Sequence, residues 1–339
     1  MKAITYLDVQ TIACRTDLEI PKVREGWALI RGAYAGICGS DLIIYSGTHP
    51  RAKAPLIMGH EMSGTIVEGH PTLPPGTPVA VNPLLSCGKC EACAGGDSHV
   101  CETLGLLGID ADGGMAEYIL APIHKIVPLP ENVSLKMGAF IEPVAVAVHA
   151  IRKGAYQPGD TAVVYGAGAI GLCTALTLRK FGALNMVVLE PNALRAQVAK
   201  DLGFTVMDPL QGDLQGDLQA EIKNLWNGKG IDTIFDCAGH PAVMSQIPQI
   251  IKPVGKIVVV GTYKKPPEVN LQIGMFKELS FQCVRVYTDM DFKIAAKLVA
   301  QEKDYEKVVT HVLKPEQAQE GFDYMLHPSG ALKVMFCFE

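Results

Sequence analysis

The pattern of hydrophobic and polar positions differs between two parts of the chain. Up to about residue 145, short apolar runs are separated by Pro- and Gly-rich turns, a pattern typical of short β-strands. The clearest runs lie at 27–30, 64–67 and 78–81. This part is therefore predicted to be an irregular, mainly β domain.

The second part, from about Gly159, alternates apolar runs with helical stretches. Residues 161–165 form a continuous apolar run, as expected for a strand buried on both faces of a parallel sheet. Further strands are predicted at 186–189, 231–235 and 256–260, and helices at 169–181 and 193–202. The alternation predicts βαβ units and hence a doubly wound α/β sheet.

The pattern weakens at two places. The near-duplicate at 211–219, Gln-Gly-Asp-Leu-Gln-Gly-Asp-Leu-Gln, is too short for a structural repeat and is interpreted as a local surface irregularity. After about residue 289 the periodicity loosens, and the tail at 332–338 is expected to return to the first domain as a strand.

Composition narrows the class of protein. A chain of 339 residues with 48% hydrophobic and 19% charged residues fits two globular domains. The net charge of −5, with Lys and Arg scattered, argues against a nucleic-acid partner. No apolar run is long enough to span a bilayer, so no membrane partner is expected. Ten cysteines without a signal-peptide core at the N-terminus predict a reducing, cytoplasmic location.

Four of these cysteines, Cys87, Cys90, Cys93 and Cys101, lie in one Gly-rich segment as C-x2-C-x2-C-x7-C. Four thiolates at this spacing suit a tetrahedral Zn²⁺ with every position filled, which is a structural site. Two disulfides would need an oxidising compartment, and a redox pair would not require two further cysteines. The spacing therefore predicts a structural zinc site.

The predicted strand at 161–165 is followed by Gly166-Ala-Gly168-Ala-Ile-Gly171, a G-x-G-x-x-G motif that opens a helix. Gly166 permits a tight turn, Gly168 lets the backbone approach a pyrophosphate, and Gly171 lets the helix pack against the strand. The helix N-terminus at Ala169 and Ile170 would present free N–H groups to the anion. Dinucleotide binding is predicted, against the alternative of a Gly-rich turn without a ligand.

Glu190 ends the next predicted strand and favours NAD as the dinucleotide. A carboxylate here can accept both ribose hydroxyls of NAD and would repel the 2′-phosphate of NADP. Arg195 would favour NADP, because a nearby Arg can bind a 2′-phosphate. Its position five residues after Glu190, however, places it on the following helix.

A second, mixed set of metal-binding residue types precedes and follows the four cysteines. It consists of Gly36-Ile-Cys38-Gly-Ser40-Asp41, Gly59-His60-Glu61 and Ile141-Glu142-Pro143. Catalytic zinc keeps a position open and has about three protein ligands. Cys38, His60 and one or two carboxylates would form such a set.

With these motifs in this order, together with Asp112-Gly-Gly-Met-Ala-Glu-Tyr118, the chain resembles the zinc-dependent medium-chain dehydrogenases of the alcohol dehydrogenase superfamily. The resemblance covers nearly the whole length. It implies a β-rich, GroES-like catalytic domain at 1–147 and 289–339, and a Rossmann NAD-binding domain at 148–288. It also implies a homodimer or homotetramer. Residues 256–260 would join two sheets if they formed an outer strand, but an internal strand is the favoured interpretation.

The resemblance assigns roles to the residues that match the family motifs. Cys38, His60 and Glu142 fall on the catalytic zinc ligands; Glu rather than Cys at the third place is typical of the polyol, sugar and threonine branch. Glu61 is an alternating or direct ligand, Asp41 orients His60, and Ser40 bonds the substrate alcohol. The chain departs from many relatives at Ile43, where they carry a proton-relaying His.

The implied activity is hydride transfer between NAD and a secondary alcohol of a polyol, sugar acid, cyclitol or sugar phosphate, with two Zn²⁺ per chain. Arg285 is a candidate to face the polar substrate, although a surface Arg is as good an interpretation. Three alternatives stay open: an enzyme of the L-threonine 3-dehydrogenase type, a zinc-free quinone reductase, which would lack counterparts of Cys38, His60 and the four cysteines, and a non-catalytic, NAD-sensing zinc protein.

Overall fold

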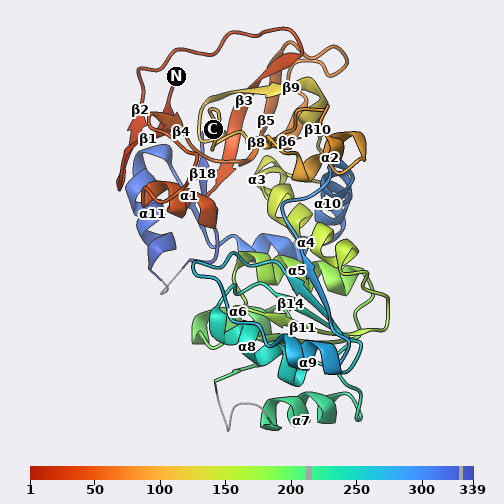
Figure 1. Cartoon of the computed structure of the whole chain (residues 1–339). Helices are drawn as coiled ribbons and strands as arrows, with labels where there is room; N and C mark the ends of the chain where they lie inside the picture. Colours follow the sequence, from red (N-terminus) through yellow and green to blue (C-terminus); the bar gives the residue numbers. More distant parts are fainter. Residues whose placement is uncertain (211–215, 328–330) are drawn as a thin grey trace. The chain divides into compact units, whose positions relative to one another are not determined.

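The computed structural model describes residues 1–210, 216–327 and 331–339, so 211–215 of the near-duplicate lie outside it (Figure 1). The chain separates into two units. Unit 1 comprises Met1–Ala145 and Tyr287–Glu339, and unit 2 comprises Val146–Val286. The boundaries expected from sequence lie two residues beyond these limits. Helix α4 (Ile141–Lys153) runs across the first boundary.

Unit 1 is built mainly from short strands in the order β10-β6-β5-β3-β18-β17, with β9 also paired to β3. The strands of this sheet are β3 (Trp27–Gly36), β5 (Glu61–Glu68), β6 (Pro78–Val81), β9 (Tyr118–Pro122), β10 (Ile126–Pro128), β17 (His311–Leu313) and β18 (Val334–Cys337). Strand β18 pairs antiparallel with β3, which confirms that the tail forms a strand of the first domain. The inward face of the sheet is apolar, with Ile30, Met62 and Val79 among its buried residues.

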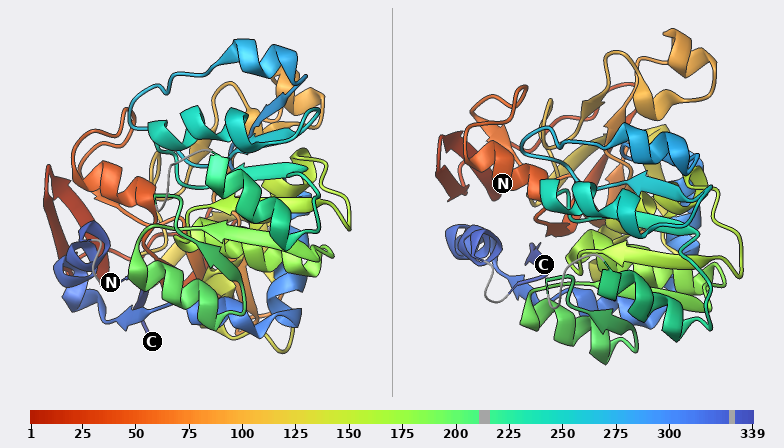
Figure 2. Two further views of the ribbon diagram at one scale, coloured as in Figure 1. Left: turned by 90° about the horizontal axis from the view of Figure 1, so that it is seen from below. Right: turned by 60° about the horizontal axis from the view of Figure 1, so that its bottom comes forward.

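Smaller elements surround this sheet. They are the strands β1 (Ala3–Asp8), β2 (Thr11–Arg15), β4 (Leu56–Ile57), β7 (Leu84–Leu85) and β8 (Gly105–Leu106), the helices α1 (Gly39–Tyr45), α2 (Glu91–Ala94), α3 (Leu135–Ala139), α10 (Asp289–Gln301) and α11 (Ala318–Leu326), and the 3-10 turns η1 (Ser98–Val100), η2 (Ile123–Lys125), η3 (Lys303–Val308) and η4 (Pro315–Gln317). Helix α11 lies beside strand β2 (Figure 2).

Unit 2 contains, in its described part, a six-stranded parallel sheet in the order β13-β12-β11-β14-β15-β16. Its elements are β11 (Thr161–Tyr165), α5 (Ala169–Lys180), β12 (Asn185–Leu189), α6 (Ala193–Asp201), β13 (Thr205–Met207), α7 (Gly216–Leu225), β14 (Thr233–Asp236), α8 (Pro241–Ile250), β15 (Lys256–Val259), α9 (Leu271–Phe276) and β16 (Ser280–Cys283). This is the strand order of the dinucleotide-binding Rossmann fold, and the order reverses between β11 and β14. The predicted doubly wound sheet is confirmed.

Helices cover both faces of this sheet. Leu218 and Ile222 of α7 and Ile247 and Ile250 of α8 pack on one face in a continuous apolar cluster. Helix α5 lies on the other side of the sheet (Figure 1). All five residues of β11 are buried, which explains why apolar residues follow Thr161 without alternation.

Within the described residues, no helix is both long and apolar enough to cross a bilayer.

Candidate active site and metal centres

Cys38, His60 and Glu61 are brought together by the pairing of two neighbouring strands. Cys38 follows the end of β3 and begins α1, where its N–H donates to Asp41 Oδ2 at 2.8 Å. His60 and Glu61 stand at the start of β5, and the antiparallel register sets Glu61 opposite Gly36 of β3. The sulfur, a ring nitrogen and a carboxylate oxygen of the three residues lie within 4.8 Å of one another.

The His60 ring has a different neighbour at each nitrogen. Nε2 lies 3.4 Å from Ser40 Oγ, so the hydroxyl stands at the edge of the donor set. Nδ1 lies 3.9 Å from Asp41 Oδ1, which is longer than a hydrogen bond. Among the described residues, neither Nδ1 nor Oδ1 has a hydrogen-bond partner. A small shift would bring Nδ1 and Oδ1 within hydrogen-bond distance. The expected role of Asp41 in orienting His60 requires that bond.

Glu142 lies in the first turn of α4 and is held by a residue that the sequence did not single out. Its Oε1 accepts a hydrogen bond from the hydroxyl of the fully buried Tyr287 at 2.9 Å. Glu142 does not belong to the group of donors within 4.8 Å, which contains Glu61 instead. Arg285, the residue proposed near this place, is exposed.

Lys333 is a second unexpected neighbour of the site. It directly precedes β18, and its buried Nζ donates to Ile37 O at 2.9 Å and to Glu61 Oε1. The other carboxylate oxygen of Glu61, Oε2, is buried and has no hydrogen-bond partner among the described residues. An orphaned carboxylate oxygen beside a thiol and an imidazole fits a metal ligand.

Burial controls the electrostatics of the site. It raises the pKa of Asp41, and it raises the pKa of Glu142 to about 7. For Lys333 burial acts in the opposite direction, but the charges of Glu61 and Cys38 outweigh it and the pKa of the ammonium is raised. A divalent cation among these groups would favour their ionised forms.

Cys87, Cys90, Cys93 and Cys101 converge at a second place in unit 1. The Sγ–Sγ distances are 3.5 Å for Cys90–Cys93, 3.8 Å for Cys90–Cys101 and 4.0 Å for Cys87–Cys93. Four sulfurs around a zinc ion, each at about 2.3 Å, stand about 3.8 Å apart, whereas a disulfide needs about 2.05 Å. None of the ten cysteines, all in the described ranges, forms a disulfide. The arrangement fits zinc and does not fit two disulfides.

Backbone N–H groups favour the thiolate form at Cys87 and Cys101, whereas burial raises the pKa of Cys93 to about 12. The N–H groups of Lys89 and Cys90 lower the pKa of Cys87 to about 6. The N–H of Cys87 donates to Cys101 Sγ at 3.3 Å and lowers the pKa of that thiol. Thiolates are the metal-binding form of cysteine.

The glycine motif of unit 2 forms the turn between β11 and α5, where the strand order of the sheet reverses. Gly166 has φ +90°, and a Cβ on Gly171 would lie 1.8 Å from Gly166 O. A Cβ on Gly168, in contrast, would meet nothing within 4 Å. The turn thus leaves open space before the N-terminus of α5, at Ala169 and Ile170, which fits a pyrophosphate.

Glu190 lies at the end of β12, beside this turn. Its Oε2 accepts the N–H of Ala167 at 2.7 Å, and its Oε1 accepts the N–H of Asn192 at 2.8 Å. Each carboxylate oxygen can accept a second hydrogen bond, so ribose hydroxyls remain possible partners. Arg195 lies in the first turn of α6 and is half-buried.

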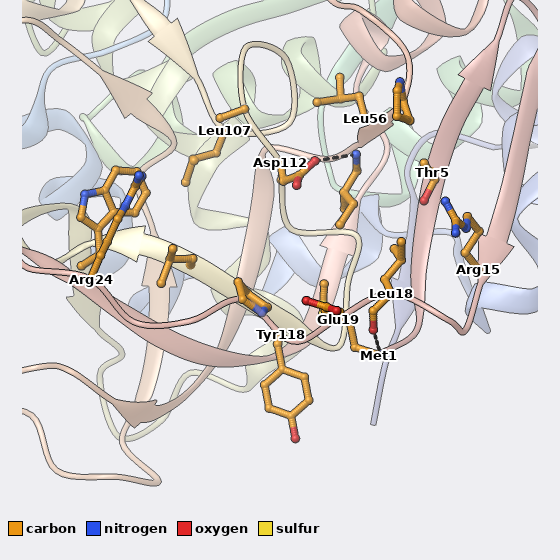
Figure 3. A pocket seen from close by; sticks show the side chains of 17 residues that line it. Met1, Thr5, Arg15, Leu18, Glu19, Arg24, Leu56, Leu107, Asp112 and Tyr118 are labelled. Carbon is orange, nitrogen blue, oxygen red and sulfur yellow. Dashed lines mark hydrogen bonds between the residues drawn. The ribbon is translucent and has the colours of Figure 1, made fainter.

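A cavity of about 420 Å³ in unit 1 is separate from these sites (Figure 3). Leu18, Trp27 and Leu56 are among its lining residues, and none of the predicted metal ligands is. The cavity does lie near the segment that leads to His60. Asp112 lines the cavity and accepts the N–H of Ile57, three residues before His60, at 3.0 Å. That contact gives the Asp-Gly-Gly motif a structural role.

Two family models match the chain. Residues 24–131 match the alcohol dehydrogenase GroES-like domain, and residues 169–301 match the zinc-binding dehydrogenase domain.

Individual relatives cover most of the chain. The 2-dehydro-3-deoxy-L-galactonate 5-dehydrogenase of Pseudoalteromonas atlantica is 35% identical over 79% of this chain and 78% of its own length. An L-threonine 3-dehydrogenase of Pyrococcus horikoshii is 30% identical over 91% of this chain and 90% of its own. The NADH complex of the rspB alcohol dehydrogenase from Escherichia coli CFT073 superposes with a TM-score of 0.91 at 31% identity, covering 100% of this chain and 99% of that one.

Proposed function

The chain belongs to the zinc-dependent medium-chain dehydrogenases, and from this premise we propose that it oxidises a polar secondary alcohol with NAD. The observation that carries the proposal is the donor set of half-buried Cys38 with buried His60 and Glu61, and with buried Glu142 near it. A mixed S/N/O set that does not fill every position of a zinc ion suits catalysis rather than structure.

Two kinds of group are needed for this chemistry. Bound Zn²⁺ would serve as a Lewis acid that lowers the pKa of an alcohol, and NAD would accept the hydride. Cys38, His60 and one or both of Glu61 and Glu142 would hold the catalytic ion. Cys87, Cys90, Cys93 and Cys101 would hold a second, structural ion.

Ser40 is placed to handle the proton of the alcohol. Its hydroxyl is half-buried and lies 3.4 Å from His60 Nε2, so a substrate oxygen at the donor set would be within its reach. A hydroxyl can accept the alcohol proton while donating its own, which makes Ser40 the first member of a relay. Asp41 would hold the His60 ring by its other nitrogen.

The substrate class follows from the site and the relatives together. Carboxylate ligands make a zinc site harder and richer in oxygen than a third thiolate would. One relative acts on a galactonate derivative, which is a polyhydroxylated sugar acid. We therefore favour a sugar acid, polyol, cyclitol or sugar phosphate. Threonine is the second candidate, because a relative that covers nearly the whole chain is a threonine dehydrogenase.

A substrate screen tests the activity. Zinc-loaded protein is mixed with NAD and a panel of sugar acids, sugar alcohols, cyclitols, their phosphates, threonine and ethanol, and reduced cofactor is followed by its absorbance. We expect a polyhydroxylated substrate to give the highest kcat/KM, because ethanol has no second polar group to bind. If ethanol is the best substrate, the proposed class is wrong; if nothing is turned over, a non-catalytic NAD-binding role replaces it.

Glu190 is proposed to select NAD over NADP. Replacing it with Gln removes the charge while keeping an oxygen acceptor for Ala167 or Asn192. Repulsion of a 2′-phosphate by the carboxylate amounts to roughly 1 kcal/mol or more in a partly screened site, so the NAD/NADP ratio of kcat/KM should fall about fivefold to tenfold. Glu268→Gln, an exposed position in unit 2, is the control. A native enzyme that prefers NADP would contradict the role.

We further propose a two-fold oligomer formed through unit 2. Strand β15 has neighbours on both sides, so the outer strand is β16 rather than residues 256–260. Near this open edge, α9 exposes Leu271 (68%), Met275 (66%) and Phe276 (76%). In the described part of the chain β16 has no strand partner on its outer side, and such an edge next to exposed apolar side chains suits pairing with a second copy across a two-fold axis.

Sedimentation measures this assembly directly. The native protein should sediment as a dimer or tetramer at micromolar concentration, and Phe276→Asp should shift it toward the monomer because a charge would be buried in the contact. Leu184→Asp, at an 85% exposed position elsewhere in unit 2, should have no effect. A monomeric native protein would contradict the proposal.

The proposed location is the reducing cytosol. Free thiols and a four-thiolate zinc site persist there, and none of the ten cysteines, which all lie in the described ranges, forms a disulfide.

A further inference from the structure

A buried lysine shares a carboxylate with the proposed catalytic metal. Lys333 contributes an ammonium with a side chain only 3% exposed, and Glu61, its partner, is 1% exposed. The two residues lie 272 positions apart in the chain. Lys333 is fixed by its second hydrogen bond, to Ile37 O at 2.9 Å, and by the antiparallel pairing of β18 with β3. The ammonium therefore stands at a defined place behind Glu61.

The two oxygens of Glu61 have different environments. Oε1 is bonded to Lys333 Nζ, whereas Oε2 is buried without a hydrogen-bond partner among the described residues. Oε2 lies over Gly36, where even a Cβ atom would come within 2.0 Å. One oxygen is thus held by the cation and the other is not, although the same carboxylate belongs to the donor group with Cys38 and His60.

The acidic groups around the Lys333–Glu61 ion pair give this contact an effect on metal binding. Asp41, Glu61 and Glu142 are all buried, and Cys38 adds a fourth acidic group. A divalent cation is attracted by these groups and repelled by the ammonium of Lys333. Since water is largely excluded, that repulsion is screened much less than it would be at the surface.

We propose that Lys333 competes with the catalytic metal for Glu61 and so keeps this carboxylate a weak, exchangeable ligand. The coordination position next to Ser40 then stays available to the substrate alcohol. Lys333 is a positioning residue, because it acts through Glu61. The inference rests on the proposed function only in that the Cys38–His60 site must bind Zn²⁺.

The opposite role, in which Lys333 merely orients a normal ligand, predicts a different sign. Loss of a residue that orients a metal ligand typically lowers metal affinity about 10–100-fold. Loss of a competitor should instead raise it. The affinity of the site for metal, measured without substrate, therefore separates the two roles.

The experiment compares metal binding and turnover in Lys333→Met and Lys333→Arg. Zinc is removed, the four-cysteine site is reloaded first, and the second site is titrated with Zn²⁺ against a chromophoric chelator. Lys333→Met should bind Zn²⁺ about tenfold or more tightly, and its kcat should fall about tenfold or more, because Glu61 occupies the substrate position. Lys333→Arg keeps the charge and should bind Zn²⁺ within about threefold of the native protein.

Titration with Co²⁺ alone provides a second readout, since its visible spectrum reports the number of ligands. The spectrum of Lys333→Met should move toward higher coordination. In the double variant Lys333→Met with Glu61→Gln, both the tighter binding and the spectral change should disappear, because the carboxylate that Lys333 holds is no longer present. Unchanged or weaker Zn²⁺ binding in Lys333→Met overturns the proposal.

A third variant covers the case in which Lys333→Met does not fold. Glu61→Gln keeps the shape of the side chain, and a weak ligand predicts that Zn²⁺ affinity then falls less than tenfold. A fall of more than about 100-fold would identify Glu61 as a full ligand and overturn the proposal. The substrate screen is independent of these titrations: native protein that binds zinc at this site but oxidises no alcohol refutes the function and leaves the role of Lys333 standing.

Discussion

Cys38→Ser is expected to lower kcat/KM by roughly 10³-fold or more while the protein stays folded. Cys38 supplies the thiolate of the proposed catalytic set and caps the start of α1 through its backbone, which serine preserves. A metal acting as a Lewis acid contributes several kcal/mol of transition-state stabilisation, and each 1.4 kcal/mol, approximately, is a factor of ten in rate. A serine hydroxyl at neutral pH is a far poorer zinc ligand than a thiolate.

Metal content and stability distinguish this result from simple unfolding. The native protein should contain two zinc ions per chain, and Cys38→Ser one, because the four-cysteine site is untouched. The melting temperature measured in excess chelator should stay close to the native value under the same conditions. Cys14→Ser, at a half-buried position of β2, removes a thiol outside both sites and should retain two zinc ions and native activity. Full turnover by Cys38→Ser would exclude this metal site from catalysis.

Regular elements of unit 2 could be predicted closely from sequence because their signals are local. Residues 161–165 form β11 with no change of bounds, and α5 ends one residue before the predicted 181. An apolar run before three glycines is read from a few adjacent positions. In unit 1 only β3, β5, β6 and the tail strand β18 were expected by range. Helix α10 was missed although Thr288 and Asp291 form a capping box, which is a start signal that the sequence carries.

The candidate site was predictable only in part, for a physical reason. Cys38, His60 and the carboxylates stand in short motifs that resemble those of a known family. Tyr287 and Lys333 carry no such signal: they reach Glu142 and Glu61 across 145 and 272 positions of the chain. A lysine in an apolar tail is normally exposed, and only the return of β18 to β3 buries it. The family resemblance suggested Arg285, which is exposed, yet Tyr287, two residues on, contacts Glu142.

Cys93→Ser is expected to remove one zinc ion and open the segment 87–101. This segment, which carries the four cysteines, has little apolar packing of its own: α2 (Glu91–Ala94) has no buried residue. The metal is therefore its main cross-link, so metal binding and local folding are the same event. With three thiolates left, zinc affinity at this site should fall at least about 10³-fold.

Limited proteolysis should report the opening of the segment. Native protein should resist cleavage between 87 and 101, Cys93→Ser should be cut there rapidly, and native protein stripped by a chelator should behave like the variant. Ser98→Ala lies in the same segment but removes no thiolate, so it should remain protected and keep two zinc ions.

The two sites should also load metal independently. Cys93→Ser should still bind its catalytic ion, because Cys38, His60 and Glu61 are held by β3, β5 and α1 rather than by this segment. Protection of Cys93→Ser equal to that of the native protein would show that packing, not a metal, holds the four cysteines together.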